Sequence, residues 1–206
     1  MRTHIVTFVS AFDKKRFRVT LDEGDVTFLL YSGELRRTGL REGTELSEED
    51  YRKILEEILI PRAKKRAVYY LKNGDRSEMQ IRRKLREGGY PPEAAEACMV
   101  FLRQLQFADD ERLAKNYVNS HRGRCSRREL KAKLSAKGID RELIEEAVSE
   151  ITGEDEKTAA EKALHGRSGK DLRKNFAYLL SKGFSYETAR EALGNGEEDS
   201  RSDSGF

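Results

Sequence analysis

Three stretches of the chain share one glycine-centred pattern, and this repeat constrains the fold more than any other feature. A leucine lies four residues before each glycine, an apolar residue follows it, a helix-capping residue lies twelve residues earlier, and a glutamate lies four residues later. The matching residues are Ser77, Leu85, Gly89, Tyr90 and Glu93; Ser126, Leu134, Gly138, Ile139 and Glu142; and Asp171, Leu179, Gly183, Phe184 and Glu187. A pattern that recurs after 49 and then 45 residues predicts three tandem helical units.

Each copy of the pattern describes the start and end of a helix. Ser77 with Gln80, and Ser126 with Glu129, have the spacing of capping boxes that begin a helix. The glycine supplies the left-handed residue that ends it, and the next apolar residue packs beneath. We expect a helix before and a helix after this middle one. The expected first helices are Ala63 to Lys72, Asp110 to Arg122, and residues 155–164.

The third unit departs from the pattern. Asn175 stands where the other units have Ile81 and Leu130. The apolar residues of this unit, Leu172, Phe176 and Leu180, shift the apolar stripe by one position. The third unit is therefore the weakest copy of the repeat pattern.

The first 60 residues differ in pattern. Residues 3–9, 16–21 and 26–31 are rich in β-branched and aromatic side chains and predict a small antiparallel meander. Ser47 then begins an amphipathic helix, which we expect to end at Pro61.

These patterns predict a mainly α protein. It has three tandem three-helix, helix-turn-helix-like repeats in an elongated curved array, preceded by a small β-meander plus helix. The expected divisions are an N-terminal module at 1–60, repeats at 61–108, 109–152 and 153–193, and a disordered acidic tail at 194–206.

Composition excludes several classes of protein. Charged residues make up 37% of the chain, and no apolar run approaches the roughly 18 residues of a membrane span. Cys98 and Cys125 show no pairing pattern, so we expect free thiols in a reducing cytosol, with Cys98 in the core and Cys125 either an inert or a reactive loop thiol. We expect a cytoplasmic monomer.

No catalytic pattern is found, so we expect no catalytic residue, metal or cofactor. His4, His121 and His165 lack metal-ligand spacing. The stretch GRSGKD at 166–171 lacks the spacing of a phosphate-binding loop and favours a turn between helices.

Charge is distributed unevenly. Residues 62–140 hold 20 Lys or Arg against 10 Asp or Glu, and the excess lies on the middle helices, whereas the third helices are acidic. In a helix-turn-helix, the second helix enters the major groove, and the acidic third helix of each unit would take that place. Its negative charge would face the phosphates, which disfavours major-groove reading. The sequence instead predicts a basic stripe along the middle helices that contacts a phosphate backbone or a helical filament. Its residues are Arg82, Arg83, Lys84, Arg86, Arg122, Arg124, Arg127, Arg128, Lys131 and Lys133.

The residues resemble those of a known family. FADDERLAKNYVNSHR at 107–122, followed by RRELKAKLSAKGID, is similar to the signature of the RecX family of bacterial regulatory proteins. YLLSKGFSYETAREAL, near the C-terminus, resembles the family's last element. The resemblance implies a non-enzymatic modulator that binds the RecA recombinase and its filament on DNA and inhibits strand exchange, ATP hydrolysis and co-protease activity, with single- or double-stranded DNA as a further partner.

Two other functions stay open at this point. One is an independent DNA- or RNA-binding protein that uses the basic stripe. It is disfavoured because the aromatic residues are expected on apolar faces rather than as stacking platforms. The other is a purely structural repeat adaptor.

Overall fold

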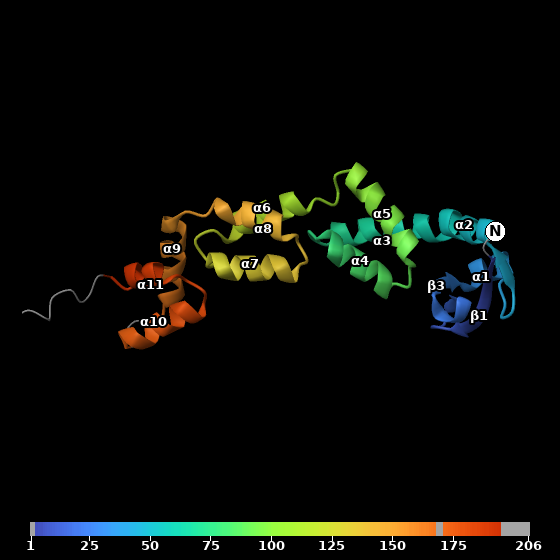
Figure 1. Ribbon diagram of the computed structural model, residues 1–206, viewed down its shortest axis with the longest axis horizontal. Coiled ribbons are helices and arrows are strands. Elements are labelled where there is room, and N and C mark those ends of the chain that lie inside the picture. The colour runs from blue at the N-terminus through green and yellow to red at the C-terminus, as the bar shows by residue number, and fades with distance from the viewer. Residues whose placement is uncertain (1–2, 168–170, 195–206) are drawn as a thin grey trace, which may run out of the picture. The chain divides into compact units, whose positions relative to one another are not determined.

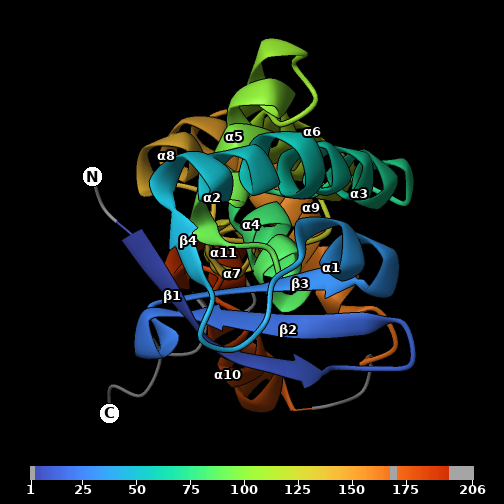
Figure 2. The same cartoon turned by 90° about the vertical axis from the view of Figure 1, so that its right-hand side faces the viewer.

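The computed structural model describes residues 3–167 and 171–194, and its N-terminal part is a small antiparallel sheet. The predicted meander is present as β1 (Thr3–Ala11), β2 (Arg16–Leu21) and β3 (Val26–Tyr31). A short strand, β4 (Glu45–Ser47), pairs with the other edge of β1, so the order is β3-β2-β1-β4 (Figure 2). Alternate residues such as Val19 and Leu21 are fully buried, which gives the sheet one apolar face.

The sequence did not reveal β4 or the helix α1 (Ser32–Thr38) that follows β3. The strand is only three residues long, and helix α1 has no buried residue. Neither element therefore has a hydrophobic period long enough to predict.

The prediction that a helix ends at Pro61 is wrong. Helix α2 (Glu48–Ile54) begins at Ser47, whose Oγ accepts from the Asp50 N–H as expected, but it continues through a π-helical turn, Leu55–Leu59, into α3 (Ile60–Lys72). Proline disrupts a regular helix because it lacks an N–H and crowds the carbonyl of the preceding turn. The wider turn, in which the Ile60 N–H donates to the Leu55 carbonyl, places Pro61 in the first turn of α3, where both defects are tolerated.

The three predicted helical repeats are present (Figure 1). Their helices are α3, α4 (Glu78–Glu87) and α5 (Pro92–Gln104); α6 (Asp110–His121), α7 (Arg127–Ala136) and α8 (Arg141–Ser149); and α9 (Gly153–Leu164), α10 (Leu172–Ser181) and α11 (Tyr186–Ala192). Each middle helix ends in the same way. The Tyr90, Ile139 and Phe184 N–H groups donate back to the Leu85, Leu134 and Leu179 carbonyls at 3.1, 3.3 and 3.2 Å.

The caps follow the sequence with one correction. Ser77 and Gln80 form the full capping box. Ser126 accepts from the Glu129 N–H, but the Glu129 side chain binds Lys133 instead of returning to the cap. The Ser126 hydroxyl donates to the Lys182 carbonyl at 2.8 Å, so it joins the second repeat to the third.

The third repeat keeps the core register of the others, so the prediction of a shifted stripe is wrong. Leu179 is fully buried and Asn175 is 7% exposed, with its Oδ1 accepting from Arg167 Nε at 3.2 Å. Leu172 and Leu180 are exposed. Asn175 can occupy a position that is apolar in the other repeats because the Arg167 guanidinium donates a hydrogen bond to its side-chain oxygen.

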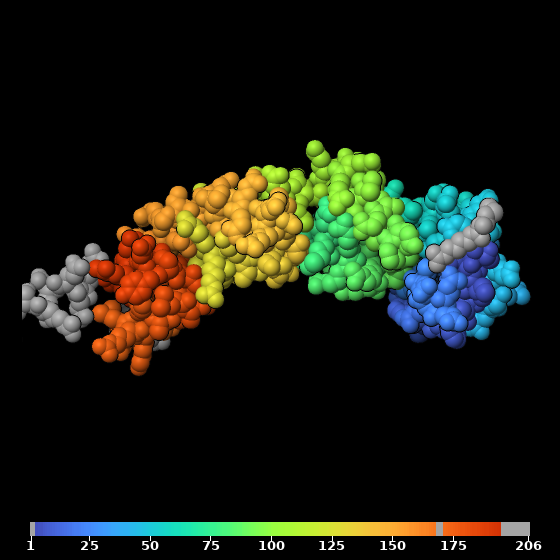
Figure 3. All heavy atoms as spheres, viewed as in Figure 1, coloured from blue at the N-terminus to red at the C-terminus, as the bar shows by residue number. Residues whose placement is uncertain are grey.

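The chain divides into two compact units, one ending at Asp109 and the other beginning at Asp110. In the first, the sheet and the first repeat share one hydrophobic core that runs from Val6 to Ala108. The main-chain N–H of Leu29 on β3 donates to the Gly89 carbonyl at 3.0 Å. A division at residue 60 would cut both a continuous helix and this core. In the second unit, the second and third repeats each have their own core and pack side by side (Figure 3).

Two expectations concern residues outside the described ranges. The acidic tail was expected at 194–206, and of these residues the structure describes only Gly194. The turn between helices was expected at 166–171, and its residues 168–170 lie outside the described ranges.

Replacing Gly89 by Ala should destabilise the first unit more than replacing Gly39. Both glycines have positive φ, +77° and +68°, so each variant carries left-handed strain of about 1–2 kcal/mol. A Cβ at Gly39 meets nothing within 4 Å, whereas one at Gly89 would overlap Leu29, with Cδ1 at 2.5 Å. We expect Gly89→Ala to lower the free energy of unfolding of the first unit by about 1–3 kcal/mol more than Gly39→Ala. Urea denaturation with a probe in the first unit measures this difference. Equal losses would show that Leu29 does not pack as described.

Deleting residues 1–59 should unfold the first repeat selectively. The deletion removes Phe28, Tyr51 and Leu59, which lie in the shared core. Hydrogen exchange should show loss of protection across α3, α4 and α5 but unchanged protection across α6 to α8, which have a separate core. Full protection of α4 in the shortened chain would contradict a shared core.

Candidate interaction surface

Arg82, the first residue of the predicted stripe, is held between two carboxylates. Its Nη1 lies 3.0 Å from Oε2 of Glu78 on the same helix, and its Nε lies 2.7 Å from Oε1 of Glu96 on α5. Glu78 also receives both arms of Arg103 from the end of α5. Arg82 therefore joins two helices of the first repeat and is only 28% exposed.

Two cations of α7 are bound in a similar way. Lys131 Nζ lies 2.5 Å from Glu145 Oε2 on α8, and Lys133 Nζ lies 2.7 Å from Glu129 Oε1 on its own helix. Both pairs are partly exposed, so they partly neutralise the basic helix while adding little stability.

Arg122 and Arg127 fasten the second repeat to the third. Arg127 Nη1 lies 3.3 Å from Oε2 of Glu156, whose side chain is only 9% exposed, and its other arm donates to the Ile151 carbonyl. Arg122 Nε lies 3.6 Å from Asp155 Oδ2. Reversing the charge of Arg127 would place two carboxylates together in a nearly buried site, so that change would test folding rather than binding.

The pairs Arg82–Glu96 and Lys131–Glu145 occupy equivalent positions of the repeat. In each, the cation lies seven residues before the glycine of the repeated pattern, Gly89 or Gly138, and the acid lies seven residues after it. The contrast between basic middle helices and acidic third helices therefore arises partly from ion pairs within each repeat. The sequence-based interpretation, which assigned the contrast to an external partner, needs this correction.

Other predicted cations are more available. Arg83 is 60% exposed and its Nε is 3.8 Å from Glu87 Oε1, a loose pair. Lys84 Nζ lies over the ring of Tyr70, 5.7 Å from its centroid. The remaining ones are Arg86, Arg124 and Arg128. All three are exposed, and within residues 3–167 and 171–194 no ion pair joins them to a carboxylate. These residues are the part of the predicted stripe that can meet a partner without breaking an internal contact.

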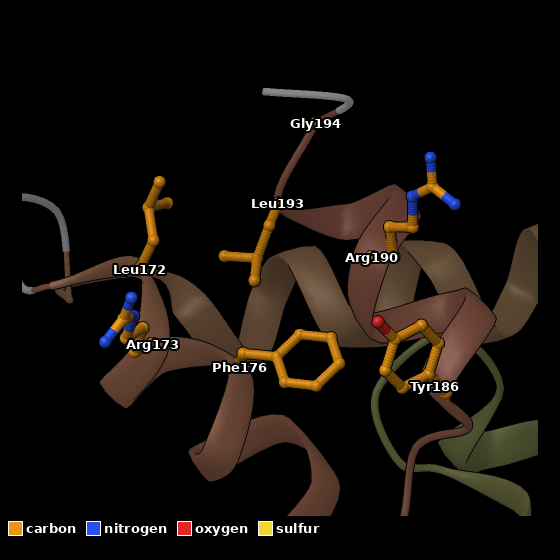
Figure 4. Close-up of a pocket in the computed structure, with 7 residues that line it drawn as sticks. All are labelled: Leu172, Arg173, Phe176, Tyr186, Arg190, Leu193 and Gly194. Carbon is orange, nitrogen blue, oxygen red and sulfur yellow. The ribbon is translucent and has the colours of Figure 1, made fainter. Parts of the chain in front are cut away.

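The third repeat replaces the ion pair by an apolar pocket. Phe176 and Arg190 occupy the two equivalent positions, and Phe176 packs edge-on against Tyr186 with ring centroids 5.0 Å apart. The pocket measures about 410 Å³, with Phe176 and Leu193 pointing into it and Arg173 at its edge (Figure 4). The equivalent surfaces of the repeats therefore differ in chemistry.

Sequence reasoning missed the basic and aromatic surface of α3. Lys65, Arg66 and Tyr69 are exposed on this helix, and Tyr69 is 57% exposed. Tyr31 on β3 is 43% exposed. The expectation that aromatic residues lie on apolar faces is wrong for these tyrosines. The clustering of cations with two tyrosines between residues 62 and 72 was the signal that could have identified this surface.

The described residues contain no group of three or more His, Cys, Asp or Glu side chains arranged to hold a metal ion. His4 is buried between Asp22 and Glu48, where it ties β1 to the start of α2.

Cys98 lies in the core as expected, and burial raises the pKa of its thiol to about 11. Cys125 is half-buried with its Sγ 3.6 Å from Lys133 Nζ. Among the same residues, no helix has the length and apolar character needed to cross a membrane.

Glu78→Gln should destabilise the first unit by roughly 1 kcal/mol at neutral pH. Hydrogen bonds from Arg103, and then from Arg82, hold the pKa of Glu78 below its usual 4.5. A lowered pKa gives stability that is present above pH 4.5 and is lost as the pH falls through the folded value. The difference in free energy of unfolding between parent and variant should therefore be constant near neutrality and shrink below pH 4.5, as measured by denaturation across pH.

Glu87→Gln is the matched control on the same helix. Among the described residues, Glu87 pairs only with Arg83, at 3.8 Å and largely in solvent, so we expect almost no change. Equal effects of the two substitutions would contradict a structural role for Glu78.

Comparison with known proteins agrees with this fold. A family model for the first three-helix domain of RecX matches residues 63–102, and a model for the second matches residues 109–148. The regulatory protein RecX of Clostridioides difficile (strain 630) is 28% identical over 200 residues, which is 92% of this chain and 94% of that protein. The protein of the same description from Clostridium acetobutylicum is 27% identical over 206 residues, 94% of this chain and 96% of that one.

Solved structures show the same architecture. A crystal structure of regulatory protein RecX superposes with a TM-score of 0.61 at 27% identity, covering 93% of this chain and 99% of that one. The crystal structure of RecX from Lactobacillus salivarius gives a TM-score of 0.58 at 26% identity, covering 66% of this chain and 96% of that one. Two domain models in the order of the repeats, relatives that align along nearly the whole chain and a crystal structure that covers 93% of it show that the chain is similar to the RecX family of regulatory proteins.

Proposed function

We propose that this protein binds the RecA recombinase and its filament on DNA and inhibits the recombinase, ATPase and co-protease activities of that filament. The match of RecX domain models to the first two repeats is the observation that carries the proposal. The relatives that match along nearly the whole chain are described as regulatory proteins.

The surface chemistry supports a binding role. Two exposed arginines lie near the N-terminus of α7, Arg124 before the Ser126 cap and Arg128 in the first turn, and neither has a carboxylate partner among the residues described. The stem of Arg128 packs over Gly183, since a Cβ there would lie 2.9 Å from Arg128 Cβ. A guanidinium supported in this way loses less entropy on binding phosphate or carboxylate oxygens.

The direct test measures ATP hydrolysis by the cognate recombinase on single-stranded DNA while this protein is added. We expect the rate to fall with increasing protein and the protein to co-sediment with the filament. An unchanged rate together with no co-sedimentation would refute the proposal.

The double variant Arg124→Glu with Arg128→Glu should fold normally and inhibit poorly. We expect the concentration for half-inhibition to rise roughly tenfold or more, because like charges across an interface cost on the order of kilocalories per mole. Circular dichroism checks folding, and these positions leave the Arg127 and Lys131 ion pairs intact.

Arg141→Glu with Lys174→Glu is the control, with the same change in net charge at exposed sites outside the predicted stripe. Similar inhibition by the two double variants would show that Arg124 and Arg128 do not form the interface.

A further inference from the structure

A basic and aromatic pocket lies in the first unit, where the sheet meets α3 and the turn after α4. It measures about 470 Å³. Four cations line it: Arg16, Arg62, Lys65 and Arg66. Its aromatic lining is Tyr31, Tyr69 and Tyr90, and no carboxylate is among the lining residues.

The four cations divide into two kinds. Arg16 binds Asp13 at 2.7 Å, and Arg62 binds Glu34 at 2.6 Å, so these two are positioned by internal carboxylates. Lys65 and Arg66 are exposed, and the described residues give neither of them an ion pair. The Arg66 side chain is oriented by a hydrogen bond from its Nε to the Tyr70 hydroxyl at 3.1 Å. The pocket therefore keeps a net positive charge at its α3 edge.

The tyrosines present ring faces beside these charges. The Arg62 guanidinium lies over Tyr31 and Tyr90, 5.1 and 5.4 Å from their centroids, and Arg66 lies 5.6 Å from that of Tyr69. Tyr69 and Tyr31 remain 57% and 43% exposed. Exposed rings held in place by cations offer stacking surfaces that need little ordering on binding.

A second pocket continues this surface across the sheet. It measures about 450 Å³ and shares Tyr90 with the first. Arg18 and Arg86 line it, and Arg18 lies over the exposed ring of Phe12, 5.1 Å from the centroid. Glu87 is the one carboxylate among its lining residues. The combined surface thus alternates cations and aromatic rings over two adjoining hollows.

We propose that these two pockets form a binding site for single-stranded nucleic acid, with Lys65 and Arg66 on the phosphates and Tyr69 stacked on a base. An extended polymer fits two connected hollows better than a single nucleotide does. A duplex hides its base faces inside the stack, so it cannot use the tyrosines. The site is separate from the α7 arginines, and its occupation does not require a recombinase.

The test is fluorescence anisotropy of a labelled oligothymidylate titrated with the full-length protein, without recombinase. The parent should bind with strong salt dependence. Lys65→Ala with Arg66→Ala should reduce the slope of log affinity against log salt by roughly 1.4, because each phosphate contact on a single strand contributes about 0.7. Arg52→Ala with Lys174→Ala removes the same charge from exposed sites outside both pockets and should leave the slope nearly unchanged.

Stacking is tested separately. Tyr69→Leu should weaken binding roughly five- to hundredfold, the range expected for one stacked base, whereas Tyr69→Phe should bind like the parent. Tyr186→Leu is the control, since Tyr186 is also exposed but lies in the third repeat.

Three outcomes would overturn the proposal: no saturable binding by the parent, equal losses for Tyr69→Leu and Tyr186→Leu, or a duplex or free ATP bound as tightly as the single strand. If Tyr69→Leu instead inhibited the recombinase poorly while binding oligothymidylate normally, this surface would be a protein interface. Because the assay contains no recombinase, its failure would leave the proposed inhibition of RecA unaffected.

Discussion

The helix end built from a leucine, a left-handed glycine and an apolar residue is the contact on which each repeat depends. In all three copies, the residue after the glycine returns its N–H to the leucine carbonyl five positions earlier. The two side chains are thereby brought together in the core, where Leu85, Leu134 and Leu179 are fully buried. The middle helix cannot be lengthened or shifted without losing both the hydrogen bond and the burial, so this turn fixes the direction of the helix that follows.

The same turns also carry the contacts between neighbouring parts of a unit. The Gly89 carbonyl accepts from the Leu29 main chain, and the side chain of Leu29 fills the space beside the glycine. Gly183 receives the stem of Arg128, and the adjacent Lys182 carbonyl accepts from Ser126. A residue with a Cβ would separate these surfaces. Close packing against the glycine therefore attaches the sheet to the first repeat and the third repeat to the second.

Equivalent positions in the repeats have been given different chemistry without changing the fold. The positions seven residues before and seven residues after the repeated glycine hold Arg82 and Glu96 in the first repeat and Lys131 and Glu145 in the second. In the third repeat they hold Phe176 and an arginine. These positions face outward between the middle and last helices, so they contribute little to the core and can diverge. The repeats therefore present surfaces of different chemistry on one shared fold.

The sequence by itself determined the repeat, its capping residues, the three strands of the meander and the resemblance to the RecX family, because each rests on short-range spacing along the chain. It also identified the basic middle helices. Only the tertiary structure decided which charges are free, since Arg82 and Lys131 meet acids fourteen residues away on another helix. Such pairs depend on how two helices pack and leave no local pattern. Tertiary packing likewise decided that the helix passes Pro61, where burial of Ile58 and Leu59 favours continuation through a widened turn. It also brought Tyr31 on a strand to Tyr69 on a helix, because the shared core folds the sheet against α3.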